Sequence, residues 1–271
     1  MDDKTQQAPP QPRSSSTWRR LLLAAVVGTA LLGLLLFHPG NAPGARRLVC
    51  SNHLKQIALA LHEYHQTYGC LPPAHTDGRN GKPMHSWRVL ILPFLKHGEL
   101  YRQYDLAQPW NSPKNSLLAK HIPPEYRCPA APEGNPLATS YVAVVGASTA
   151  WPGRKSVRFQ DIKDGTSDTI LLVEVADSGI NWMEPCDIKF EQAIVGVNLD
   201  KHGGIGSRHH GGANVVLADS SSRFLPESVS PAALKALLTL ADGETLDDDE
   251  DGRLFVRPPL PASDTGDANR E

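Results

Sequence analysis

The feature that most constrains this chain is a run of 17 largely apolar residues without a charge, at residues 21–37. A helix of that length extends about 26 Å, close to the thickness of the hydrocarbon core of a bilayer. Trp18 precedes the run, and an indole ring favours the membrane interface. Because only a helix satisfies its own backbone within lipid, we expect a transmembrane helix over residues 21–38, with the lipid bilayer as its partner.

Basic residues before the run set its expected orientation. Arg13, Arg19 and Arg20 lie on the N-terminal side, and positively charged flanks remain in the cytoplasm. We therefore expect residues 1–20 to be a cytoplasmic polar tail. The chain would cross the cytoplasmic (inner) membrane once, and everything after the run would lie outside the cytoplasm.

A cleaved signal peptide is the alternative interpretation of the same run. Signal peptides have a shorter apolar core, of about 7–15 residues, followed by a cleavage site with small residues. Gly40 and Ala42 offer such a site, but Pro43 would then follow the cut. The length of the run favours an uncleaved anchor, and cleavage stays open as the alternative.

Composition excludes two broad classes of protein. With 27 Lys+Arg against 29 Asp+Glu, the net charge is −2, so no nucleic-acid partner is expected. Four Cys among 271 residues exclude a disulfide-dense scaffold. The 22 Gly and 23 Pro favour a loop-rich fold over a helical bundle.

Hydrophobic periodicity predicts an α+β domain. An amphipathic helix with a start at Ser51 or Asn52 and a stop at Gly69 is followed mainly by strands, and a last helix covers residues 231–240. Because helices precede strands, we expect the long helix to pack on an antiparallel sheet. The predicted strands are residues 139–145, 170–175, 193–197, 213–217 and 221–225.

Composition shifts predict the domain boundaries. Residues 39–47 contain Pro39, Pro43 and Gly44 and are expected to be a linker. The folded extracytoplasmic domain is expected to cover residues 48–246. Residues 247–271 are acidic and contain proline, which is typical of a disordered tail.

Several ordered motifs within residues 48–246 carry a resemblance to one family. The series begins with Cys50-Ser-Asn-His-Leu-Lys-Gln and ends with His209, nine residues and then Asp219. These motifs resemble the bacterial domain of unknown function DUF1559, whose members are often named prepilin-like or H-X9-DG proteins. The resemblance implies a pilin-like extracytoplasmic domain of unassigned activity. Its motif residues are Asn52, Leu54, Lys55, Gln56, Tyr64, His65, Trp87, Cys128, Pro129, Asp164, Gly165, Thr166, Ser167, Thr169, His209 and Asp219.

The chain departs from that family pattern in three places, and one is the segment from Pro39 to Gly44, which interrupts what is a single continuous helix in pilins. The usual prepilin signature, with a Glu inside the apolar helix, does not occur between Thr17 and Phe37. Processing by a prepilin peptidase and assembly into a filament are therefore not expected. Ser220 replaces the glycine that follows the closing aspartate, so the turn is expected to avoid a backbone conformation that only glycine tolerates.

A histidine-rich and glycine-rich segment is the first candidate metal site. His202, His209, His210 and Asp219 are ligand types that suit zinc, and they would serve a metal-dependent hydrolase. Their spacing matches no known metal motif. The alternative is a glycine-rich loop that leads into a hairpin, in which His209 forms a hydrogen bond across to the Asp219 turn. We favour this structural interpretation and predict no catalytic residue.

An acidic segment is the second candidate. Asp247, Asp249 and Asp251 precede Gly252 in the pattern that opens a calcium-binding loop. The twelfth position is Pro258 instead of the bidentate glutamate, so a solvated tail is favoured over calcium-assisted surface adhesion. No cofactor is predicted.

The cysteines leave the disulfide pairing open. Cys50 and Cys70 lie at opposite ends of the predicted helix, about 30 Å apart, so they cannot bond to each other. Cys128 with Cys186, or either of them with Cys70, stays open. Glu174 is unusual within an apolar strand, and we expect it to face solvent or to pair with an Arg or a His.

Together these features predict a single-pass protein of the cytoplasmic membrane. Its outer domain would be pilin-like and non-enzymatic, with a structural or interaction role in the cell envelope. Its protein partners there are not identified by the sequence.

Overall fold

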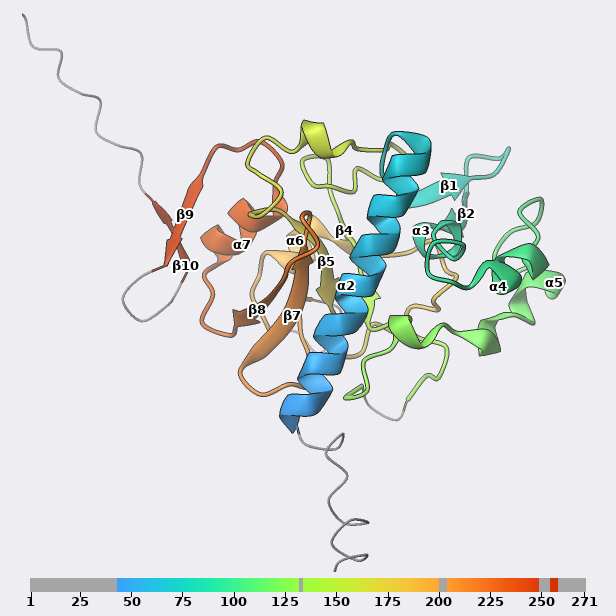
Figure 1. The fold of residues 1–271 in the computed structure, drawn as a ribbon, viewed down its shortest axis with the longest axis horizontal. Coiled ribbons are helices and arrows are strands. Elements are labelled where there is room, and N and C mark those ends of the chain that lie inside the picture. Colours follow the sequence, from blue (N-terminus) through green and yellow to red (C-terminus); the bar gives the residue numbers. More distant parts are fainter. Residues whose placement is uncertain (1–42, 132–133, 200–203, 249–253, 258–271) are drawn as a thin grey trace, which may run out of the picture. The chain divides into compact units, whose positions relative to one another are not determined.

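The computed structural model describes residues 43–131, 134–199, 204–248 and 254–257 (Figure 1). The chain divides into two units, Met1–Ala45 and Arg46–Glu271, and the described elements belong to the second unit except for the first residues of its leading helix. The predicted membrane segment, residues 21–38, lies outside the described residues. None of the helices described combines the length and the apolarity needed to cross a bilayer.

The leading helix, α2, covers Pro43–Tyr68 and is 26 residues long. Its buried side chains, Leu54, Ile57 and Leu61, recur at helical spacing and form one apolar face. The predicted start near residue 51 is wrong, and residues 43–47 of the predicted linker are helical. Proline is tolerated in the first turn of a helix because its missing N–H has no partner there. The helix ends, as predicted, at Gly69, which has a φ of 77°.

The central sheet has four antiparallel strands in the order β3-β5-β7-β8. The fold is therefore α+β with an antiparallel sheet, as the sequence predicts. The strands are β3 (Tyr141–Val142), β5 (Ile170–Glu174), β7 (Gly212–Leu217) and β8 (Ser222–Pro226).

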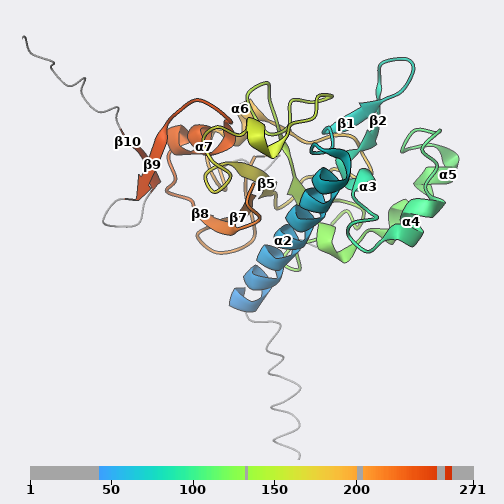
Figure 2. The same cartoon turned by 45° about the horizontal axis from the view of Figure 1, so that its top comes forward.

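The two faces of this sheet contact different helices. Alternate side chains of a strand point to opposite faces, so Leu172 and Val216 belong to the apolar cluster around α2. Val173 and Val215 belong to a second cluster with α7 (Pro231–Leu238). The two views show α2 passing across the sheet (Figures 1 and 2). The central sheet thus lies between two helices.

Short elements complete the described residues. Two antiparallel pairs flank the central sheet, β1 (His75–Asp77) with β2 (Pro83–Ser86) and β9 (Thr245–Asp248) with β10 (Leu254–Arg257), and β4 (Val144–Val145) pairs in parallel with β6 (Ile188–Lys189). The short helices are α3 (Trp87–Leu90), α4 (Gly98–Gln103), α5 (Pro113–Ser116), η2 (Ala119–His121), η3 (Pro124–Tyr126), η4 (Phe159–Asp161) and α6 (Phe190–Ala193).

Two local predictions need correction. Residues 193–197 are not a strand. Ala193 is the last residue of α6, and a turn follows it at residues 194–195. The side chain of Gln192 accepts a hydrogen bond from the Lys189 backbone N–H at 3.0 Å, which favours a helical turn. The sequence also predicts disorder from residue 247 onward, but residues 247–248 belong to β9 and residues 254–257 form β10. Leu254 packs against the second apolar cluster, and that burial stabilises the pair.

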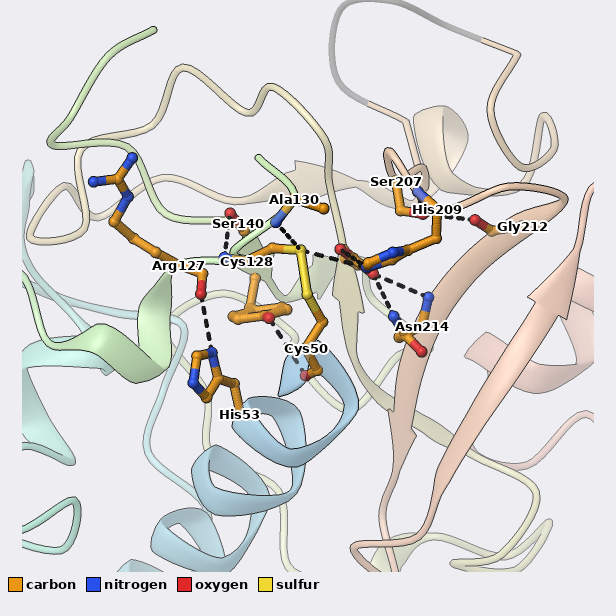
Figure 3. The surroundings of a disulfide bond; sticks show 12 residues. Cys50, His53, Arg127, Cys128, Ala130, Ser140, Ser207, His209, Gly212 and Asn214 are labelled. Carbon is orange, nitrogen blue, oxygen red and sulfur yellow. Dashed lines mark hydrogen bonds and ion pairs between the residues drawn. A yellow bond between two sulfur atoms is a disulfide. The ribbon is translucent and has the colours of Figure 1, made fainter. Parts of the chain in front are cut away.

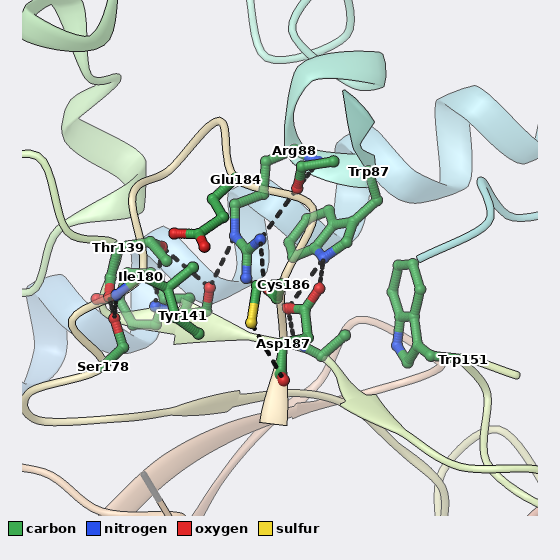
Figure 4. Close-up of polar contacts among 12 residues, drawn as sticks. Trp87, Arg88, Thr139, Tyr141, Trp151, Ser178, Ile180, Glu184, Cys186 and Asp187 are labelled. Carbon is green, nitrogen blue, oxygen red and sulfur yellow. Dashed lines mark hydrogen bonds and ion pairs between the residues drawn. The ribbon is translucent and has the colours of Figure 1, made fainter. Parts of the chain in front are cut away.

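The core contains an ion pair between Arg88 of α3 and Asp187, and both side chains are buried (Figure 4). The Arg88 guanidinium also donates to the Tyr141 carbonyl at 3.2 Å and to Ser86 Oγ at 3.0 Å. Asp187 accepts from the Ala143 N–H at 2.8 Å as well. Burial raises the pKa of Asp187, although Arg88 and the N–H donors act in the opposite direction. The pair therefore ties α3 to the start of the sheet through satisfied polar groups.

The turn between β7 and β8 contradicts the expectation for Ser220. Its φ is 70°, which is the left-handed conformation that the absence of glycine was expected to exclude. The Ser220 N–H donates to the Leu217 carbonyl at 3.0 Å, and the Leu217 N–H donates to the Ser221 carbonyl at 2.8 Å. Such a three-residue hairpin loop requires a left-handed residue at this position. The hydrogen-bonded pairing of β7 with β8 therefore imposes the left-handed conformation on Ser220.

We expect Ser220→Gly to raise the free energy of unfolding by roughly 1 kcal/mol, because glycine adopts this conformation without the clash of a Cβ atom. Urea unfolding followed by circular dichroism measures the change. Ser221→Gly is the matched control, since Ser221 has no positive φ, and it should destabilise the protein. A Ser220→Gly variant no more stable than wild type would contradict this account of the turn.

We expect Asp187→Asn to lower the free energy of unfolding by about 3–5 kcal/mol, because the buried Arg88 guanidinium loses its counter-charge. Thermal and urea unfolding provide the measurement. Glu99→Gln removes an exposed ion pair with Arg102 and should leave the unfolding midpoint unchanged. Equal effects of the two substitutions would show that the buried pair contributes no more than a surface pair.

Candidate functional site

The predicted histidine cluster does not converge among the described residues. His209 is buried, whereas His210 is exposed. Asp219 lies in the β7–β8 turn, where its Oδ1 accepts from the Ser221 N–H at 2.8 Å. β7 separates His209 from Asp219 by about 20 Å, so the expected hydrogen bond from His209 to the Asp219 turn is wrong. His202 lies outside the described residues.

The predicted calcium segment is only partly described. Asp247 belongs to β9, and Asp249 and Asp251 lie outside the described residues. The side chain of Asp247 is not described. The calcium alternative therefore receives no further support from the geometry.

The structure brings together a different set of ligand-type residues, which we call the disulfide cluster: Cys50, Cys128, Glu174 and His209. One potential ligand atom of each lies within 4.8 Å of the others, and all four residues are buried. They come from α2, the loop after η3, the end of β5 and the segment before β7. Each of these residues stands out in the sequence, but no sequence pattern places them together.

Cys50 and Cys128 form a disulfide, with their Cα atoms 5.2 Å apart (Figure 3). The sequence leaves open Cys128 with Cys186, or either of them with Cys70, and the observed pairing differs from all of these. Ser140 positions Cys128, because its Oγ accepts from the Cys128 N–H at 3.0 Å. The other two cysteines are free, with Cys186 exposed and Cys70 half-buried. The bond links the N-terminal part of α2 to a loop 78 residues later in the chain.

Polar contacts with Asn214 and His209 hold the carboxylate of Glu174 in the core. Its Oε2 accepts from the Asn214 N–H at 3.2 Å and from Asn214 Nδ2 at 2.7 Å. Its Oε1 lies 3.3 Å from Nε2 of His209. Glu174 therefore pairs with a histidine, one of the two outcomes expected from the sequence. Two-residue alternation explains why Glu174 and Asn214 both face α2, together with Leu172 and Val216.

The same imidazole nitrogen of His209 also faces the disulfide. Nε2 lies 3.4 Å from Cys128 Sγ, and Figure 3 shows the ring directed toward that sulfur. Burial raises the pKa of the neighbouring Tyr141 well above its usual range, and the Glu174 carboxylate raises it further. Tyr141 is therefore a neutral phenol, and its OH donates to the Cys50 carbonyl at 3.3 Å.

The glycine-rich segment places His209 in this cluster. Ser207 Oγ donates to the Gly212 carbonyl at 2.6 Å and accepts from the His209 N–H at 3.0 Å. A Cβ atom on Gly212 would lie 2.0 Å from the Leu225 carbonyl oxygen, so no other residue fits there. The glycine-rich segment thus leads into a hairpin, as the structural interpretation predicted.

A surface groove of about 480 Å³ lies apart from the disulfide cluster, between the β1–β2 turn and residues 109–111. Arg79, Lys82 and Trp110 contribute to its walls. None of its lining residues is an Asp, Glu, His, Tyr or Cys, so Lys82 is the one lining side chain of a type that acts in acid–base catalysis.

The remaining motif residues stabilise turns, pack in the core or lie at the surface. Asp164 accepts from the Asp242 and Gly243 N–H groups at 3.0 Å each, and the Thr166 carbonyl accepts from the Asp219 N–H at 3.0 Å. Thr169 Oγ1 donates to the Gly165 carbonyl at 3.0 Å. Among the others, Leu54 and Trp87 are buried, Tyr64 and His65 are half-buried, and Asn52, Lys55, Gln56, Pro129 and Ser167 are exposed.

A family model described as "Protein of unknown function (DUF1559)" matches residues 43–155. The matched range contains α2, its disulfide partner Cys128 and β3. Glu174 and His209 lie beyond it. No curated protein and no solved structure gives a significant match to the chain.

We expect the double substitution of Cys50 and Cys128 by Ser to lower the free energy of unfolding by about 3–5 kcal/mol. The bond closes a loop of 78 residues and restricts the unfolded chain accordingly. Urea unfolding is the measurement, and the double substitution of the free Cys70 and Cys186 by Ser is the matched control. If both double variants unfold at the wild-type midpoint, the disulfide does not stabilise the domain.

Proposed function

We propose that this chain, which the DUF1559 family model matches over residues 43–155, is a member of that family and a membrane-anchored protein of the cell envelope. The description of the family assigns no activity. Residues 1–20 lie in the cytoplasm, residues 21–38 cross the cytoplasmic membrane, and the domain from residue 48 lies outside. That domain is pilin-like and non-enzymatic, and it has a structural or interaction role toward other envelope proteins.

The buried disulfide between Cys50 and Cys128 is the observation that carries the proposal. Disulfides form and persist in oxidising compartments outside the cytoplasm, whereas cytosolic thiols are kept reduced. Both of its cysteines are buried in the core, as expected of a structural crosslink. It supports an extracytoplasmic location independently of the apolar run.

The arrangement of α2 supports the pilin-like part of the proposal. A 26-residue helix that packs across an antiparallel sheet is what the family resemblance implies. The helix begins six positions after residue 37, where the apolar run ends. In the proposed arrangement the domain therefore follows its anchor after a short connection.

Fractionation of cells that express the full chain with a C-terminal tag tests the proposal. We expect the protein in the membrane pellet after alkaline extraction, and we expect external protease to remove the tag from intact spheroplasts. The intact mass should include the apolar run. Deletion of residues 1–38 should move the protein to the soluble fraction, because the apolar run supplies the membrane affinity.

Deletion of residues 1–16 is the matched control, because it leaves Trp18, Arg19, Arg20 and the apolar run in place. This variant should stay in the membrane pellet. Membrane association that survives deletion of residues 1–38, a protected tag, or a mature chain that starts after residue 42 would each overturn the anchored topology.

A further inference from the structure

The disulfide cluster contains the complete donor set of a metal site. Two sulfur atoms, one imidazole nitrogen and one carboxylate oxygen come from Cys50, Cys128, His209 and Glu174. Cys, His and Glu are the residues that bind Zn²⁺ in proteins, and structural zinc sites are four-coordinate. Their four ligand atoms lie within 4.8 Å of one another in the core.

The distances already approach those of a tetrahedral site. Bond lengths of about 2.0–2.3 Å place the ligand atoms of such a site roughly 3.3–3.8 Å apart. His209 Nε2 lies 3.3 Å from Glu174 Oε1 and 3.4 Å from Cys128 Sγ. The two sulfur atoms are bonded to each other and so lie closer together than metal ligands would, and reduction of the disulfide removes that bond.

Surrounding groups hold the potential ligands in place. Asn214 fixes the second carboxylate oxygen of Glu174, and the Ala130 N–H donates to Cys128 Sγ at 3.4 Å (Figure 3). Hydrogen bonds of this kind orient metal ligands and tune their affinity. Because all four residues are buried, the site leaves no open position for a substrate, which is typical of a structural metal site.

We propose that the reduced form of this protein binds one Zn²⁺ ion through Cys50, Cys128, Glu174 and His209. The same residues then provide two alternative crosslinks, a disulfide in the oxidised chain and a metal ion in the reduced chain. A dithiol donates two electrons and two protons to open the disulfide and becomes a disulfide itself. Metal binding then displaces the two thiol protons. The proposal does not depend on the membrane location.

Cobalt binding to the refolded full chain tests the proposal. Cys70 and Cys186 are first replaced by Ser, so that the only thiols are those of the cluster. The chain is reduced with a phosphine in denaturant and refolded anaerobically in detergent, with and without Co²⁺. We expect one Co²⁺ per reduced chain, with thiolate-to-cobalt charge-transfer absorption, and none in the oxidised chain.

Substitutions of Glu174 and His209 distinguish binding at this site from adventitious binding by the two thiols alone. Glu174→Gln and His209→Ala should each lower the Co²⁺ affinity at least tenfold, whereas the exposed His210→Ala should leave it unchanged. Absence of the charge-transfer absorption, or equal affinity in Glu174→Gln, His209→Ala and the parent protein, would overturn the proposal.

A second measurement covers the case in which the variants do not fold. Zn²⁺ should increase the yield of reduced parent protein that regains its near-ultraviolet circular dichroism, because an ion that binds only the folded chain stabilises it. The same ion should not change the refolding of the oxidised chain. A reduced chain that refolds equally well with and without Zn²⁺ would contradict the inference.

Discussion

The contact between α2 and one face of the central sheet determines the rest of this domain. The helix contributes Leu54, Ile57 and Leu61 at helical spacing, and the sheet contributes alternate residues of β5 and β7. Side chains alternate between the two faces of a strand, so Glu174 and Asn214 lie on the same face as these apolar residues. One strand register therefore places both the polar and the apolar side chains of the interface. A shift of one residue in β5 would exchange Glu174 for Val173 and would leave a carboxylate against α7.

Polar groups buried at two places make the arrangement specific. Arg88 and Asp187 join α3 to the start of the sheet, and Glu174 and His209 join β5 to the segment before β7. Each of these four side chains has hydrogen-bond or ion-pair partners within the fold. Removing one partner of the Arg88–Asp187 pair is costly, because the remaining charge stays in a medium of low polarity.

The sequence predicts the class of the fold and most of its long elements, because their periodicity is local. The helix at α2, the strands at β5, β7 and β8 and the last helix follow from patterns of apolar residues. The strand expected at residues 193–197 fails because a short apolar run does not distinguish a strand from a helical turn. The disulfide cluster was not predicted, since its members are separated by up to about 160 residues and only tertiary packing unites them. At Ser220 the tertiary structure overrides a local preference: the pairing of β7 with β8 holds a serine in a left-handed backbone conformation that serine disfavours.

The position of the disulfide has a mechanical consequence. A pulling force applied at the N-terminal end of α2 reaches Cys50 and passes through the covalent bond to Cys128. Residues 51–127 therefore carry none of the load, and the helix cannot be peeled from the sheet beyond its second turn. Traction at this end of the chain is borne instead by the part of the chain that follows Cys128, including the sheet.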